Sequence, residues 1–193
     1  MPSPDPARPV RSDARRNRDK LVAVARAAFA TGPVALETVA REAGVGIGTL
    51  YRHFPTREAL VEAVYAAELD DVTGSAPALL EAFSPEQALR AWMDRYAAFV
   101  ATKRGMGDAF RASVASGRIA TPATRQRITA AIGSILDAGA KGGTLRADAD
   151  PEDVTVLLLG AFLSTVDDPD PERTGRLLDL IADALRPQEA DTE

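Results

Sequence analysis

Four helix starts of the same kind divide the second half of the sequence. Each is a residue whose side chain can accept a hydrogen bond at a helix N-terminus, followed by a proline at the first helical position. They are Ser84-Pro85, Thr121-Pro122, Asp150-Pro151 and Asp170-Pro171. Gln87 would complete a capping box with Ser84. These starts predict helices over 85–103, 122–140, 151–166 and 171–186, with a short helix near 106–116 between glycines.

The first half also shows helical spacing. The apolar residues of the segment 14–30 recur at one helical face: Leu21, Val24, Ala25, Ala28 and Phe29. Thr56 is a suitable N-cap for a helix over 56–72, and a short helix is expected over 78–83. No segment alternates as a strand does, and no repeat of fixed period is present. The sequence therefore predicts an all-α fold of about nine helices.

Two short helices are predicted between residues 36 and 54. The first runs from Leu36 to Ala43, and Gly44 follows it, where a helix often ends in a residue with positive φ. The second begins near Gly46 and ends near Phe54, because Pro55 disfavours the α conformation in the residue before it. Two helices joined by a short turn that contains glycine form a helix-turn-helix, whose second helix enters the DNA major groove.

The side chains of this second helix suit DNA on one side and a protein core on the other. Leu50 and Phe54 lie four residues apart and are expected to face the core. On the opposite side, Arg52 can pair with guanine, Ile47 can contact a thymine methyl group, and Gly48 lets the backbone approach closely. We expect phosphate contacts from polar residues on and around this helix: Thr38, Thr49, Tyr51, His53 and Arg57.

Some of these residues have a second interpretation. Tyr51 could be a half-buried packing residue, and His53 could have a structural role at the end of the helix. Arg41 could contact DNA or form a surface salt bridge. The tail over 1–13 is predicted to be disordered, and Arg8, Arg11, Arg15 and Arg16 could contact phosphates or be solvated.

Charge and composition narrow the class of protein. Residues 1–60 hold ten Lys/Arg against six Asp/Glu, whereas the remainder of the chain is acidic, and the net charge is −5. A basic N-terminal third is expected if that end meets phosphates. No run reaches the roughly 20 apolar residues of a membrane span, and no signal peptide is indicated. The chain lacks Cys and has a single His, so we expect a cytoplasmic protein with no membrane partner, no metal site and no cofactor.

The stretch VAREAGVGIGTLYRHFPTREALVEAV resembles the DNA-binding domain of the TetR (tetracycline repressor) family of bacterial regulators. The family pattern is met at Ala43–Val45, Gly48–Phe54 and Arg57–Leu60. The family often has Ser as helix N-cap where this chain has Gly46, a change that costs only a few tenths of a kcal/mol. In the family, positions matching Thr49, Tyr51, His53 and Arg57 commonly hold phosphates.

The resemblance implies a division of the chain into an N-terminal helix-turn-helix domain and a C-terminal domain that binds a small molecule and dimerises. The downstream segments ALRAWMDRYAAFVATKRGMGDAF and GTLRADADPEDV resemble an actinobacterial-type C-terminal domain. The expected boundaries are 14–55 for the first domain, 56–187 for the second with 56–72 as connecting helix, and 188–193 for a tail. The expected ligand-binding residues are Trp92, Met93, Tyr96, Phe99, Phe110 and Arg111, although such a stripe is also typical of a core.

The segment 151–166 is apolar almost all round, which favours a helix buried by more than one neighbour. The expected dimer interface is formed with the last helix: Leu158, Phe162, Leu177 and Ile181. The alternative is a central helix of a monomer.

The sequence thus indicates a ligand-responsive transcriptional regulator, most often a repressor in this family, that binds a palindromic operator as a homodimer. The alternative is a helix-turn-helix protein without a small-molecule effector, controlled by a protein partner or by abundance. An enzyme is disfavoured, because the chain lacks a nucleotide-binding GxxxxGK[ST] motif and a metal-ligand cluster.

Overall fold

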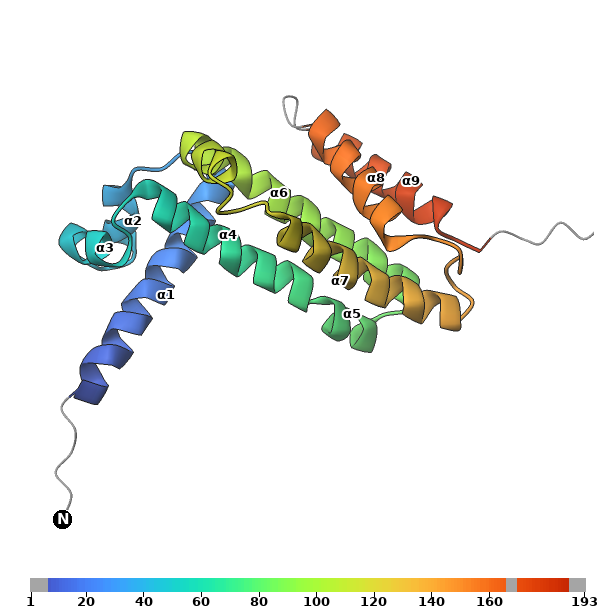
Figure 1. Cartoon of the computed structure of the whole chain (residues 1–193), viewed down its shortest axis with the longest axis horizontal. Coiled ribbons are helices and arrows are strands. Elements are labelled where there is room, and N and C mark those ends of the chain that lie inside the picture. The colour runs from blue at the N-terminus through green and yellow to red at the C-terminus, as the bar shows by residue number, and fades with distance from the viewer. Residues whose placement is uncertain (1–6, 166–169, 188–193) are drawn as a thin grey trace, which may run out of the picture. The chain divides into compact units, whose positions relative to one another are not determined.

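The computed structural model describes residues 7–165 and 170–187, without the side chains of 7–12. Across these residues the chain forms nine helices and no strand, which confirms the predicted all-α fold (Figure 1). The helices are α1 Ala7–Thr31, α2 Leu36–Glu42, α3 Ile47–His53, α4 Arg57–Gly74, α5 Ala76–Ala82, α6 Pro85–Ala115, α7 Pro122–Lys141, α8 Pro151–Ser164 and α9 Pro171–Ala184.

The predicted helix starts are confirmed by their hydrogen bonds. Side chains at the last three cap-proline pairs accept from backbone N–H groups: Thr121 from Thr124, Asp150 from Glu152 and Asp170 from Glu172. Ser84 and Gln87 exchange the two bonds of a capping box, at 3.4 and 3.3 Å. Thr56 accepts from the N–H of Ala59 at the start of α4. Each bond spans at most three residues, so these starts are properties of local sequence.

α1 extends beyond its predicted bounds, whereas α6 shows the predicted break. α1 begins at Ala7, within the segment predicted as a tail, because Ala and Arg favour the helix and Pro9 lies in its first turn, where proline is tolerated. Residues 1–6 and the predicted tail 188–193 lie outside the described residues. The two helices predicted over 85–103 and 106–116 correspond to the two parts of α6, which are separated by a kink at Gly107, where φ is 59° and ψ is −136° and neither is helical.

The described residues form two compact units that are not contiguous in sequence. Unit 1 contains the chain up to Ala67 together with Ala101–Ile119, and unit 2 contains Glu68–Val100 and the chain from Ala120 onward. α4 and α6 therefore each contribute residues to both units. The sequence-based division at residue 55 follows the helix-turn-helix motif, whereas the units follow packing.

The core of unit 1 is built from the inner faces of four helices and part of α6. Phe29 of α1, Val39 of α2, Leu50 of α3 and Val64 of α4 are buried there. Met106 and Ala109 of α6 join the same cluster. The helix-turn-helix is thus held from behind by α1, α4 and the second half of α6.

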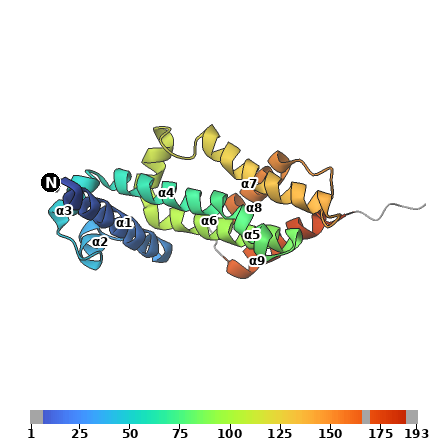
Figure 2. The same ribbon diagram turned by 90° about the horizontal axis from the view of Figure 1, so that it is seen from below.

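The core of unit 2 centres on aromatic residues of α6. Trp92 stacks on Tyr96 with ring centroids 5.4 Å apart, and Phe162 of α8 meets the edge of Tyr96 at the same distance. α8 packs against α7 and α9 (Figures 1 and 2). No helix in the described part combines the length and the apolar character that crossing a bilayer requires.

Candidate nucleic-acid interface

The turn between α2 and α3 has the geometry of a Schellman motif. Gly44 has φ of +69°, its N–H donates to the carbonyl of Arg41, and the N–H of Val45 donates to the carbonyl of Ala40. These bonds satisfy the last carbonyls of α2 and reverse the chain within three residues. A side chain at position 44 would be strained by the positive φ, so this glycine fixes the angle at which α3 follows α2.

α3 presents one face to the core and the other to solvent, as its spacing predicts. Leu50 is fully buried, and Phe54, the residue that ends α3, is nearly so. Ile47 is 39% exposed and Tyr51 44% exposed, and Gly48 and Arg52 are exposed beside them. Ile47 and Tyr51 lie four residues apart and therefore share one exposed side of α3.

Gly48 lies in open space. A Cβ atom built there would meet nothing within 4 Å, and its φ lies in the range that other residues adopt. The same holds for Gly46, whose φ of −69° and ψ of 148° are ordinary for an N-cap. Neither glycine is required by the fold of this chain. Their lack of side chains leaves the start of α3 accessible to a partner.

The other residues expected at DNA surround this face. Thr38, Thr49 and His53 are half-buried, and Arg41 is exposed. The His53 ring lies 6.3 Å from that of Phe54 in a tilted arrangement. Within the described residues no ion pair involves Arg41 or Arg52, so both guanidinium groups can meet phosphate or base without breaking a contact seen here.

Arg57 has a second set of partners that its position in the sequence does not indicate. Its Nη1 donates to the carbonyl oxygen of Val34 at 2.6 Å, and its guanidinium lies 5.5 Å from the centre of the Phe29 ring. Arg57 thereby joins the first turn of α4 to the loop that precedes α2 and to α1. The next residue, Glu58, has a lowered pKa because its carboxylate accepts hydrogen bonds from the backbone and from Thr56.

Arg18 was not among the expected site residues. Its guanidinium lies 5.3 Å from the centre of the Phe54 ring, at the end of α3. The basic character of the N-terminal segment was visible in the sequence. The contact with Phe54 was not, since the two residues are 36 positions apart.

The six expected ligand-binding residues are divided between the two units. Trp92, Met93, Tyr96 and Phe99 are buried in unit 2, and the indole N–H of Trp92 donates to the carbonyl of Val72 at 3.0 Å. The remaining two belong to unit 1. Phe110 is half-buried beside Tyr65, and Arg111 is exposed and paired with Asp108.

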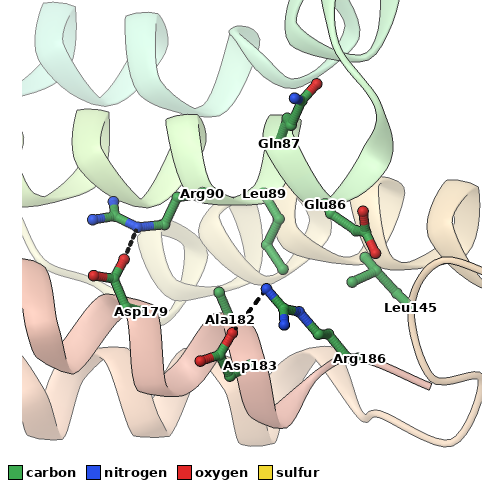
Figure 3. A pocket seen from close by; sticks show the side chains of 9 residues that line it. All are labelled: Glu86, Gln87, Leu89, Arg90, Leu145, Asp179, Ala182, Asp183 and Arg186. Carbon is green, nitrogen blue, oxygen red and sulfur yellow. Dashed lines mark hydrogen bonds and ion pairs between the residues drawn. The ribbon is translucent and has the colours of Figure 1, made fainter. Parts of the chain in front are cut away.

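A cavity of about 430 Å³ lies elsewhere in unit 2, between the start of α6, the loop before α8 and the end of α9. Its floor contains Leu89 and Leu145, and ion pairs line its rim (Figure 3). Arg90 pairs with Asp179 at 2.7 Å and Arg186 with Asp183 at 3.0 Å. Sequence reasoning missed these residues because Arg90 and Asp179 are 89 positions apart.

The four residues expected at the dimer interface differ in how deeply they are buried. Leu158 and Phe162 are buried within unit 2, whereas Leu177 and Ile181 are half-buried. The exposed apolar residues of the same two helices are Val156, Leu157, Leu163 and Leu180, of which Leu163 is 71% and Leu180 64% exposed. We call these four residues the α8–α9 surface. The sequence did not identify its α8 members, because α8 is apolar on almost every side and periodicity alone does not show which residues face solvent.

Two family models match most of the chain. Residues 21–64 match "Bacterial regulatory proteins, tetR family", and residues 84–187 match "Transcriptional regulator SbtR-like, C-terminal domain". A comparison with curated proteins found no match.

Solved structures of regulators share the fold. A TetR transcriptional regulator from Streptomyces coelicolor is 44% identical, with a TM-score of 0.77, and the match covers 89% of this chain and 99% of that one. A TetR transcription regulatory protein from Mycobacterium vanbaalenii is 34% identical, with a TM-score of 0.69, over 92% and 99% of the two chains. A regulatory protein of the same family from Rhodococcus, 18% identical over 90% and 98% of the chains with a TM-score of 0.58, shares the fold alone.

Proposed function

The chain belongs to the TetR family of bacterial transcriptional regulators, and we propose that it binds a palindromic DNA operator as a homodimer and is released from it by a small-molecule ligand. Regulators of this family bind DNA and typically act as dimers, and they are not enzymes. For this chain, the palindromic operator, the homodimeric state and the release from DNA on ligand binding are proposed.

The observation that supports the proposal most strongly is that α3 has one buried side and one exposed side. Leu50 anchors the helix in the core of unit 1, while Tyr51 and Arg52 stand in solvent on the other side. A helix inserted into the major groove needs this arrangement, because base edges can be read only by side chains that the protein core leaves free. In the proposed complex, Ile47, Gly48 and Arg52 read bases. The residues proposed to meet the phosphate backbone are Thr38, Arg41, Gly46, Thr49, Tyr51, His53 and Arg57.

The α8–α9 surface supports the proposed dimer. Four large apolar residues on two adjacent helices would remain in water if the chain were a monomer, and Gly160 lies exposed among them, where it permits close approach of a partner helix. Two copies paired there form a symmetric interface. The two α3 helices then read half-sites separated by about 34–36 Å along the duplex.

Ligand control rests on α4 and α6, which contribute residues to both units. A ligand that binds unit 2 with different affinity for two arrangements of these helices shifts the population between them, and only such a ligand can do so. The close packing of Trp92 and Tyr96 and the satisfied indole N–H favour the alternative, a DNA-binding regulator without a small-molecule effector.

The test is selection of bound sequences from a pool of randomised 40-base-pair duplexes by the full chain. The expected result is a palindrome whose half-sites lie one helical turn apart, bound at nanomolar concentration. Recovery of no common sequence would contradict the proposal. A metabolite screen against the selected duplex separates the two modes of control, since an effector-free regulator keeps the same affinity throughout.

A further inference from the structure

The cavity between the start of α6, the loop before α8 and the end of α9 has the size and the lining of a small-molecule site. Its volume is about 430 Å³, and ligand pockets in proteins measure roughly 300–1,000 Å³. Leu89 is fully buried, Leu145 is 3% exposed and Ala182 is half-buried, so the floor is apolar. Charged side chains stand around this floor (Figure 3). All of the lining residues belong to unit 2.

Both arginines that line the cavity already have carboxylate partners. Arg90 donates from Nε to Asp179 at 2.7 Å, and from Nη1 to Asp94. Arg186 pairs with Asp183 at 3.0 Å. An anionic ligand would have to take the place of these carboxylates and would leave them beside the cavity without a partner. The arrangement therefore disfavours an anion.

The remaining charge of the lining is negative. Glu86 lines the cavity from the first turn of α6, and within the described residues its carboxylate forms no ion pair. The last turn of α9 contains Asp183 and no basic residue. A cation is the charge that the negative end of a helix dipole favours. A positively charged ligand would therefore be stabilised by both helices that form the rim.

The lining suits an organic cation better than a metal ion. A metal ion needs several oxygen ligands around one point. In the part of the chain that the structure describes, no group of three His, Cys, Asp or Glu side chains could hold one. In Figure 3, Leu89 lies between the Arg90–Asp179 pair and Glu86, so the charges surround an apolar surface. A ligand with an ammonium group and a hydrocarbon body matches this combination.

We propose that this cavity is a binding site for small organic amines in their ammonium form. The ammonium group pairs with Glu86 and is stabilised by Asp183 at the end of α9. The hydrocarbon body covers Leu89 and Leu145 and removes their remaining apolar surface from water. The inference goes beyond the proposed function, because it assigns a ligand class from the cavity alone and does not depend on DNA binding.

The experiment compares three probes of one shape that differ in charge: phenethylamine, phenethyl alcohol and phenylpropanoate. Binding to the full chain is measured by isothermal titration calorimetry near pH 7 without DNA. The amine is expected to bind with a Kd of about 0.1–1 mM, as a ligand of its size allows. The alcohol should bind about fivefold more weakly or worse, and the carboxylate more weakly still. Equal binding of the amine and the alcohol, or preference for the carboxylate, would overturn the inference.

Two variants test whether the amine binds in this cavity. Glu86→Gln keeps the shape of the side chain and removes its charge, and it should weaken binding of phenethylamine about fivefold. Asp137→Asn is the control, because Asp137 is an exposed carboxylate of α7 in unit 2 that does not line the cavity. It should bind the amine as the unmodified protein does. An equal loss of affinity in the two variants would contradict the site.

Methyl NMR gives the position of the ligand independently of any substitution. The methyl resonances of Leu89 and Leu145 are expected to shift as phenethylamine is added to the unmodified protein, because the hydrocarbon body lies against them. Binding of the amine without a shift at either leucine would place the ligand elsewhere and overturn the inference.

Discussion

Gly105 of α6 lies directly against the carbonyl group of Phe29 in the last turns of α1. A Cβ atom at position 105 would overlap the carbonyl oxygen of Phe29 and would lie 2.8 Å from that of Gly32. Both neighbours are backbone atoms and cannot swing aside as a side chain would. This approach brings the second half of α6 into unit 1, behind the helix-turn-helix.

Replacement of Gly105 by alanine is therefore expected to destabilise unit 1. Relieving the overlap requires α1 and α6 to move apart, at a cost of about 1–3 kcal/mol in the free energy of unfolding. Urea denaturation measures this cost. Gly175→Ala is the control, because Gly175 is helical and has open space at its Cβ position, and it should gain up to about 1 kcal/mol. Equal stability of the two variants would contradict the close approach.

Arg57→Ala should lower stability as well as DNA affinity. The substitution removes the hydrogen bond to Val34 and the contact with the Phe29 ring, together worth about 1–3 kcal/mol. Arg41→Ala, at an exposed arginine of α2, should change stability by less than about 0.5 kcal/mol. Urea denaturation without DNA separates the two roles. An Arg57→Ala variant with normal stability and weak DNA binding would instead support a simple phosphate contact.

Tyr51→Ala and Arg52→Ala should affect DNA binding in different ways. Loss of Tyr51 is expected to weaken binding to all sequences by a similar factor, because a phosphate contact carries no sequence information. Loss of Arg52 should relax the preference at one operator position by about 1–3 kcal/mol. Binding is measured on the selected operator and its single-base variants, and circular dichroism verifies the fold. Unchanged binding in both variants would remove α3 from the interface.

Leu163→Glu/Leu180→Glu should convert the protein to a monomer. Two carboxylates per protomer would be buried unpaired in the proposed interface, which costs several kcal/mol. Sedimentation velocity distinguishes the two states. Phe83→Glu is the control, because Phe83 is also a large exposed apolar residue but lies between α5 and α6 and is not part of the α8–α9 surface. A dimeric double variant would place the interface elsewhere.

Asp148 is expected to titrate at about pH 2 in the folded protein. Arg146 donates Nε and Nη2 to its two carboxylate oxygens, each at 2.7 Å, and these bonds lower the pKa of Asp148 from 3.8 to about 2. Because the folded-state pKa is lowered, the stabilisation is fully present above pH 3.8 and is lost as the pH falls toward 2. NMR titration of the carboxyl carbon measures this pKa, and Arg146→Gln should raise it toward its ordinary value.

The burial of α8 shows where prediction from the sequence stopped. Its residues are apolar on almost every side, so periodicity could not tell which of them face the core. Leu158 and Phe162 were expected at a dimer interface and are buried in unit 2. The exposed large apolar residues of α8 are instead Val156, Leu157 and Leu163. On α3, by contrast, polar and apolar residues alternate with the helical period, and the core face was predicted correctly.

The helix starts, the turn at Gly44 and the two faces of α3 were determined by the sequence alone, because each depends on groups within a few residues of one another. The tertiary structure decided three other features: the partners of Arg57, the close approach of the Phe29 backbone to Gly105, and the contact of Arg18 with Phe54. They join residues 23 to 76 positions apart. Local propensity depends only on neighbouring residues, so it does not predict which distant backbone atom a side chain will contact.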